Sequence, residues 1–199
     1  MIRVRAAVGR SLRNVVVNMK NSWKTLGSRD IYKNDWIHLR EDKVIKPDGQ
    51  EGIYGVLETN NPGVFVVALT DDKKVVLLKL FRYTIQKDSI EVPAGGVEPN
   101  EDLFDAAKRE LKEETGILAK KWEQVGRFYA FNGVCNSPFY VFIAQDLEHI
   151  GKETDNEEGI EKSFVKPFSK VLKMIQNKEI TDGETISSIM IAGMHLNLL

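Results

Sequence analysis

The sequence of 199 residues contains a single cysteine, Cys135, which excludes a disulfide within the chain and a cluster of thiolate metal ligands. Nothing therefore indicates an oxidising compartment, and a cytoplasmic location is expected. Long apolar runs are missing too, because runs such as residues 64–69 and 75–78 have only the length of strands. A membrane-spanning helix needs about 20 apolar residues, so no membrane partner is expected.

An excess of charge of one sign is also lacking. The sequence has 28 Lys and Arg residues against 29 Asp and Glu residues, a formal net charge of −1. Such a chain has no overall attraction for nucleic acid or for an anionic membrane, so nucleic acid is not an expected partner. Any polyanionic ligand must be held by a local site.

Acidic residues are absent from the first 29 positions, although basic residues are frequent there. Residues 1–29 are therefore interpreted as a basic N-terminal arm. Two alternatives are a stretch upstream of a true start at Met19 and an organellar transit peptide, which would make the location organellar.

Two common catalytic motifs are absent. The sequence has no Gly-x-Ser-x-Gly and no His-Glu-x-x-His, and His38, His149 and His195 are widely separated. Serine-esterase and zinc-peptidase chemistry therefore lack their usual signatures.

Alternation of apolar and polar residues predicts strands in the first half of the chain. Residues 36–59 alternate on either side of a turn at residues 47–49, which predicts a hairpin. Residues 63–69 and 74–81 flank a polar turn and predict a second hairpin that continues the sheet, with strands buried on both faces.

A helix is predicted after the turn at residues 93–96. Asn100 is the expected N-cap, Leu103, Ala107 and Leu111 form the buried stripe, and Gly116 is the expected left-handed C-cap. Further strands are expected at residues 123–129, 139–144 and 163–165, and further helices at residues 169–177 and 184–196. Interleaved strands and helices predict the α/β class, a mixed sheet with helices on its faces.

Three acids share one face of the helix predicted after residue 100. Glu110, Glu113 and Glu114 are three or four residues apart, or adjacent, so their side chains gather within about a turn. Like charges so placed repel unless a cation compensates them, and carboxylates suit Mg²⁺ or Mn²⁺. Alternatively, the stripe is a solvated face that pairs with Lys108, Arg109 and Lys112.

The surrounding spacing favours the metal. From Gly95 the sequence runs through five residues to Glu101, then seven residues to Arg-Glu-Leu-Lys-Glu-Glu-Thr-Gly-Ile at residues 109–117. This segment resembles the Nudix box at all of its defining positions. The resemblance to the Nudix hydrolases implies a Nudix fold, an α/β/α sandwich with a mixed β-sheet, here preceded by an N-terminal β-hairpin region.

The same resemblance implies roles for the box residues. Glu110, Glu114 and the carbonyl of Ala94 would bind Mg²⁺ or Mn²⁺, and Glu113 would be a further ligand or a proton acceptor. Arg109 and Glu101 would organise these acids, since a guanidinium can hold a carboxylate through two hydrogen bonds.

The resemblance extends from residue 36 to the C-terminus and favours the ADP-ribose pyrophosphatase-like branch. It implies that Arg82, with Glu91, contacts substrate. It also places a late acid in the loop at residues 153–161, with Glu158 as a metal ligand and Glu157 as a possible base. That loop could equally be a plain acidic surface loop.

Substrate recognition departs from this branch in one loop. Residues 129–137 align with its substrate loop, but Asn132 replaces the characteristic proline and Ser137 a usual glutamate. The departures leave three substrate classes open: ADP-ribose, another purine diphosphate sugar and a different nucleotide conjugate. Trp36 and Phe131 are candidates to stack on the base, although a strand tryptophan is often part of the core.

The sequence thus predicts three parts: the arm at residues 1–29, N-terminal strands for dimerisation and substrate at residues 30–60, and a Nudix domain at residues 61–199. The expected function is metal-dependent hydrolysis of a nucleoside diphosphate linked to another group, and analogy favours a homodimer. The alternative is an inactive Nudix-fold module that binds a nucleotide sugar.

Overall fold

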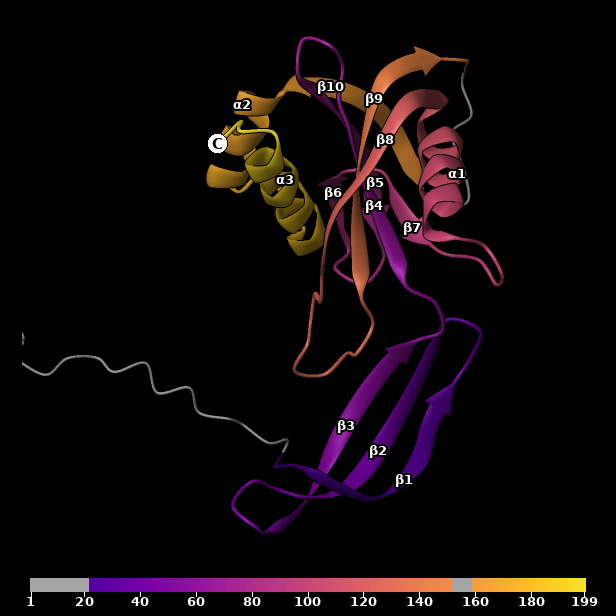
Figure 1. Ribbon diagram of the computed structural model, residues 1–199, viewed down its shortest axis with the longest axis vertical. Helices are drawn as coiled ribbons and strands as arrows, with labels where there is room; N and C mark the ends of the chain where they lie inside the picture. The colour runs from indigo at the N-terminus through magenta and orange to yellow at the C-terminus, as the bar shows by residue number, and fades with distance from the viewer. Residues whose placement is uncertain (1–21, 152–158) are drawn as a thin grey trace, which may run out of the picture.

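The computed structural model describes residues 22–151 and 159–199. In these ranges the strands form three sheets, and three helices pack on them. Figure 1 shows the sheet of β1, β2 and β3 standing apart from a main body that contains the other strands and all three helices. The described chain therefore consists of two parts, an N-terminal three-stranded sheet and a main body of strands and helices.

The N-terminal sheet is antiparallel, in the order β1-β2-β3. The predicted hairpin is confirmed, with β2 (Ile37–Ile45) paired to β3 (Glu51–Thr59). A third strand, β1 (Lys24–Lys33), pairs with β2 and begins inside the stretch interpreted as the basic arm. All ten residues of β1 are exposed, so the strand shows no apolar alternation that sequence reasoning could detect.

The main body is built on a mixed sheet in the order β7-β4-β9-β8, which confirms the predicted class. β4 (Gly63–Ala68) runs parallel to β9 (Phe139–His149), while β7 (Ala94–Gly96) and β8 (Ile117–Phe128) are antiparallel to their neighbours. Alternate residues of β4 face opposite sides, as the two-residue period of a strand requires. Val64 and Val66 belong to the core cluster under α1 (Leu103–Thr115), and Phe65 and Val67 to the cluster with α2 (Phe168–Gln176) and α3 (Gly183–His195).

The predicted second hairpin is wrong. β5 (Lys74–Arg82) follows β4 through a short turn, but the two strands share only the bridge between Leu69 and Val75. β5 instead lies between β10 (Ile160–Pro167) and β6 (Lys87–Glu91) in a separate antiparallel sheet. Both edges of β4 are already occupied by β7 and β9, so β5 has no free edge of β4 to pair with.

The start of α1 also differs from the prediction. Asn100 has a φ of 69° and lies in the preceding turn, so it is not the N-cap. Asp102 caps the helix, and its carboxylate accepts hydrogen bonds from the N–H groups of Phe104 at 2.8 Å and Asp105 at 3.0 Å. The predicted C-cap is confirmed, with Gly116 at a φ of 65°. None of the described helices is long and apolar enough to cross a membrane.

Candidate active site

Two acids of α1 point into the body and the third points out. Glu110 and Glu114, one turn apart, are 6% and 2% exposed, whereas the Glu113 side chain is 45% exposed. A carboxylate oxygen of Glu114 accepts the N–H of Ala94 at 2.9 Å. The helix is thereby held against β7, with two buried carboxylates at the contact.

Gly95 allows this close approach. A Cβ atom at this position would lie 2.0 Å from a carboxylate oxygen of Glu110, far inside van der Waals contact. A side chain at Gly95 would therefore fill the space that Glu110 occupies. The position at the start of the box requires glycine because only glycine leaves this space open.

Arg109 organises the acids around it through five hydrogen bonds. Its Nε and Nη2 donate to the two carboxylate oxygens of Glu101 at 2.9 and 3.0 Å. The remaining bonds go to Glu110 at 2.8 Å, Glu113 at 3.2 Å and the carbonyl of Gly96 at 2.9 Å. The hydrogen bond to Glu101 contributes most to a raised pKa of Arg109, and the same contact lowers the pKa of Glu101.

The donor set suits a hard divalent cation. Within residues 22–151 and 159–199, no group of three or more acidic, His or Cys side chains converges as a ready-made metal site. Mg²⁺ does not need one, because it takes one or two carboxylates and completes its shell with water and phosphate oxygens. Glu110 and Glu114, buried beside Ala94, supply two carboxylates. The predicted residues Glu157 and Glu158 lie outside the described residues.

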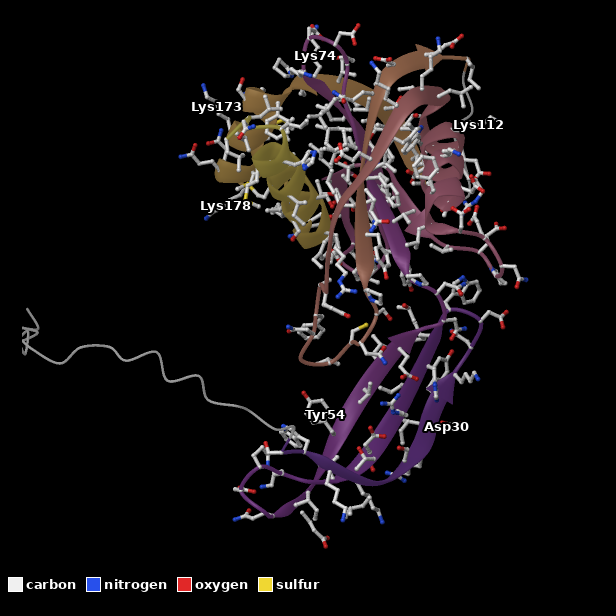
Figure 2. The ribbon with its side chains drawn as sticks, viewed as in Figure 1. Asp30, Tyr54, Lys74, Lys112, Lys173 and Lys178 are labelled. Atoms are coloured by element: carbon white, nitrogen blue, oxygen red, sulfur yellow. The ribbon has the colours of Figure 1, made fainter. Side chains whose placement is uncertain are left out.

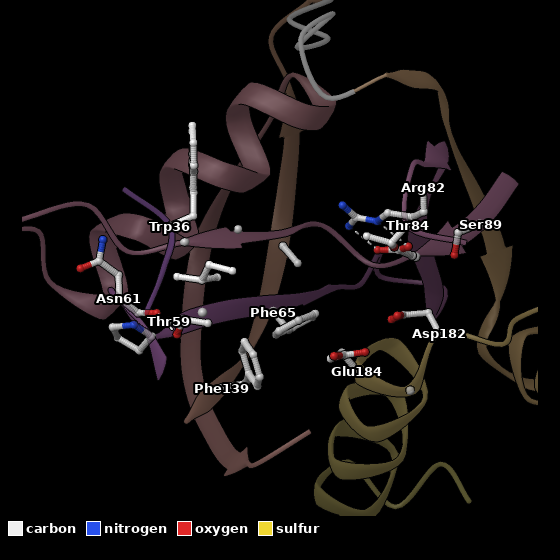
Figure 3. Close-up of a pocket in the computed structure, with 18 of the residues that line it drawn as sticks. Trp36, Thr59, Asn61, Phe65, Arg82, Thr84, Ser89, Phe139, Asp182 and Glu184 are labelled. Atoms are coloured by element: carbon white, nitrogen blue, oxygen red, sulfur yellow. Dashed lines mark hydrogen bonds and ion pairs between the residues drawn. The ribbon is translucent and has the colours of Figure 1, made fainter. Parts of the chain in front are cut away.

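A cavity of about 720 Å³ opens beside β7, between the N-terminal sheet and the main body. Figure 3 shows Trp36 at one end of this cavity and Phe65 and Phe139 in the middle. Arg82, Asp182 and Glu184 lie at the other end. The backbone of β7 forms part of its wall, so the strand that contacts Glu114 also borders the cavity.

The cavity brings together three of the four predicted substrate residues. Arg82 forms a two-pronged ion pair with the buried Glu91, at 2.9 and 2.6 Å, and both line the wall. Trp36 lies at the other end and is 75% exposed, so it is not a core residue. Phe131 is 64% exposed and is not part of the lining.

The loop that carries Phe131 is fixed to the N-terminal sheet instead. The Tyr54 hydroxyl donates to the carbonyl of Gly133 at 2.7 Å, and the N–H of Leu57 donates to Val134 at 2.8 Å. Figure 2 shows Tyr54 on this sheet, next to the loop. Ser137, which replaces a glutamate of the related branch, accepts the N–H of Thr59 at 2.9 Å and is buried.

Sequence reasoning missed the polar end of the cavity. Ser89 on β6 and the pair Asp182 and Glu184 at the start of α3 line it. Burial raises the pKa of the Glu184 carboxyl, and a hydrogen bond with the Asp182 carboxyl raises it further. The only signal in the sequence is an aspartate suited to cap α3, which does not reveal that this helix begins at the cavity.

Family models match both parts of the structure. Residues 59–184 match the Nudix domain, and residues 23–57 match the N-terminal domain of nucleoside diphosphate sugar hydrolases. The first match covers the main body as far as the start of α3, and the second covers most of the N-terminal sheet. The chain belongs to the Nudix family.

Individual relatives agree with this assignment. The chain is 32% identical to the ADP-ribose pyrophosphatase of Bacillus subtilis (strain 168), over 83% of this chain and 90% of the relative. It is 29% identical to the methanol dehydrogenase activator of Bacillus methanolicus, over 83% of this chain and 90% of that protein. A crystal structure of an ADP compounds hydrolase superposes with a TM-score of 0.78 at 19% identity, covering 88% of this chain and 94% of the other, which shows a shared fold.

Proposed function

We propose that this protein hydrolyses the diphosphate of a nucleoside diphosphate sugar, with ADP-ribose as the first candidate, to a nucleoside monophosphate and a sugar phosphate. The observation that supports this most strongly is the pair of buried carboxylates, Glu110 and Glu114, which contact strand β7. This strand borders a cavity large enough for a nucleotide. The names of two relatives, an ADP-ribose pyrophosphatase and an ADP compounds hydrolase, agree with the substrate class.

The proposed cofactor is Mg²⁺ or Mn²⁺, held by Glu110, Glu114 and the carbonyl of Ala94, with Glu158 as a further ligand. Bound there, the cation neutralises negative charge on the diphosphate as the bond breaks. Arg109 keeps Glu110 and Glu113 in position, since its planar fork is anchored on Glu101 and Gly96. Glu113 and Glu157 are the candidates to accept the proton of the attacking water.

The substrate is proposed to lie along the cavity. Arg82 is oriented by Glu91 and offers positive charge to the phosphates beside β7. Trp36 offers an exposed flat face to the base. Phe131 is the weaker stacking candidate, because its loop lies outside the cavity lining.

The alternative is an inactive module that binds a nucleotide sugar. The box retains every acid that metal binding needs, and Glu110, Glu113 and Glu101 are all engaged by Arg109. A module that only binds nucleotide has no use for this arrangement, which therefore favours hydrolysis.

We further propose a homodimer in the cytoplasm. The N-terminal sheet exposes large apolar side chains on β1 and β3, among them Ile31, Tyr32 and Ile53. An apolar surface of this kind is typical of a protein interface. The single cysteine supports the compartment.

A substrate panel tests the proposed reaction. The protein is incubated with ADP-ribose, other nucleoside diphosphate sugars, dinucleoside polyphosphates and NADH in Mg²⁺ or Mn²⁺, with EDTA controls. We expect metal-dependent release of AMP and ribose 5-phosphate from ADP-ribose. Absence of any nucleoside monophosphate across the panel would favour the binding module.

A further inference from the structure

The polar end of the cavity, called the recess, is lined by residues from two elements outside the Nudix box. Ser89 comes from β6, Asp182 is the N-cap of α3, and Glu184 lies in the first turn of that helix. Figure 3 shows the three side chains on the same side of the cavity as Arg82, away from Trp36. The recess therefore lies at the Arg82 end of the cavity, opposite the end proposed for the base.

Ser89 points to a ligand in this recess. The residue is 6% exposed, yet its hydroxyl has no hydrogen-bond partner among the residues that the structure describes. No fully buried side-chain nitrogen or oxygen atom of the described residues lacks a hydrogen-bond partner, so the Ser89 hydroxyl is open to the cavity. The hydroxyl is therefore placed to donate to, and accept from, a group that enters the cavity.

The two acids of the recess lie side by side at the N-terminal end of α3. Asp182 caps α3 by accepting the N–H of Thr185 at 2.7 Å. Its carboxylate thus interacts with the positive end of the helix dipole. Glu184 is half-buried beside Asp182, and burial together with this contact and the charge of Glu91 raises its pKa. Carboxyl oxygens accept hydrogen bonds, so the two acids offer acceptors to hydroxyl groups that enter the cavity.

This chemistry selects among the parts of a nucleotide sugar. Two neighbouring acids repel a phosphate group, and an aromatic base finds no flat side chain among Ser89, Asp182 and Glu184. Sugar hydroxyls suit the recess, because each hydroxyl donates and accepts and can pair with the serine and with both carboxyls.

We propose that Ser89, Asp182 and Glu184 form the subsite for the sugar hydroxyls of the non-nucleotide moiety. This inference rests on the proposed function and adds the orientation of the substrate. The base lies toward Trp36, the diphosphate lies beside Arg82 and β7, and the hydroxyl-bearing group lies against the start of α3.

A comparison of two substrates tests the subsite. The first is ADP-ribose, and the second is the methyl ester of ADP, which keeps the nucleotide and the diphosphate but has no second sugar. Ser89→Ala and Glu184→Ala are each expected to lower the ratio of kcat/KM values, ADP-ribose over methyl ester, by about tenfold or more. A rise in KM for ADP-ribose is expected to account for most of this loss.

Matched controls separate the subsite from general damage. Ser163→Ala on β10 and Glu179→Ala before α3 remove the same groups from exposed positions outside the cavity, and they should leave the ratio at its wild-type value. A ratio that is unchanged in both Ser89→Ala and Glu184→Ala overturns the subsite, while cleavage of ADP-ribose by the wild type still supports the proposed function.

Binding distinguishes the remaining outcomes. If the wild type does not hydrolyse ADP-ribose, its affinity for the intact compound is measured by calorimetry in EDTA. Binding that weakens about tenfold in Glu184→Ala supports the subsite although the hydrolytic function has failed. No binding, or binding that neither subsite variant weakens, overturns the subsite.

Discussion

At the scale of the residue, the site depends on how close two carboxylates come to one strand. Glu114 accepts a hydrogen bond from Ala94, and Glu110 occupies the space that a side chain at Gly95 would need. Buried carboxylates with fixed positions are suited to hold a cation against phosphate oxygens, because no reorganisation is needed when charge develops.

Replacing Glu114 with glutamine is expected to lower turnover on the order of a hundredfold or more, because it removes one negative charge from the cation site. Glutamine can still accept the Ala94 N–H, so the circular dichroism spectrum should match the wild type. Steady-state kinetics with ADP-ribose checks this, with the exposed Glu148→Gln as control. Near-normal turnover in Glu114→Gln would remove its assigned role.

Gly95→Ala is expected to displace Glu110 and lower kcat/KM by on the order of a hundredfold, since small misplacements of catalytic groups are costly. The neighbouring Gly96→Ala is the matched control, because a Cβ there meets no atom within 4 Å. Kinetics of the two variants side by side decide the matter, and equal losses in both would contradict the steric argument.

At the scale of the element, α1 is held against the chain that precedes it by an ion pair between Arg109 and Glu101. Arg109 joins Glu101, which precedes the helix, to Gly96 on β7 and to the acids within the helix. The helix is thus fixed in rotation as well as in position, and both buried acids face the strand.

This ion pair gives the stability a specific pH dependence. Hydrogen bonding by Arg109 lowers the pKa of Glu101 below its ordinary value of 4.5. The folded protein therefore binds fewer protons than the unfolded chain, and the stabilisation is complete above about pH 4.5 and is lost as pH falls through the lowered pKa.

Urea unfolding of wild type and Glu101→Gln tests this linkage. The variant should be less stable by about 2 kcal/mol at pH 7, the usual size for hydrogen bonds between charged groups, and the difference should shrink below about pH 4.5. A difference that stays constant from pH 7 to pH 3.5 would show that the charge of Glu101 is not responsible.

At the scale of the whole molecule, local signals were predictable and distant contacts were not. The box and the C-cap of α1 follow spacings within one helix, so the grouping of Glu110, Glu114 and Arg109 and the C-cap Gly116 could be predicted from sequence. The N-cap moved from Asn100 to Asp102, because either side chain can cap and only the turn geometry decides between them.

Tertiary pairing explains the misses. β5 cannot pair with β4 because β7 and β9 occupy both edges of β4. The residues of β5 alone do not show which strands pair with β4. The polar recess joins Ser89 of β6 to Glu184 of α3, which are far apart along the chain. The exposed strand β1 carries no periodic pattern at all.

The proposed dimer is a prediction at this same scale. Light scattering coupled to size-exclusion chromatography should give the wild type twice its chain mass of 22.6 kDa. Ile53→Asp places a charge on the apolar N-terminal sheet and should yield a monomer, whereas Ile150→Asp, at an exposed site in the main body, should stay dimeric. A monomeric wild type would contradict the proposed assembly.

Cation binding by the α1 carboxylates is the central claim, and Mn²⁺ titration monitored by electron paramagnetic resonance tests it most directly. In the presence of AMP, the wild type should bind Mn²⁺, and Glu110→Gln combined with Glu114→Gln should weaken this binding at least tenfold while the protein stays folded. Equal Mn²⁺ affinity in the wild type and the double variant would contradict the account.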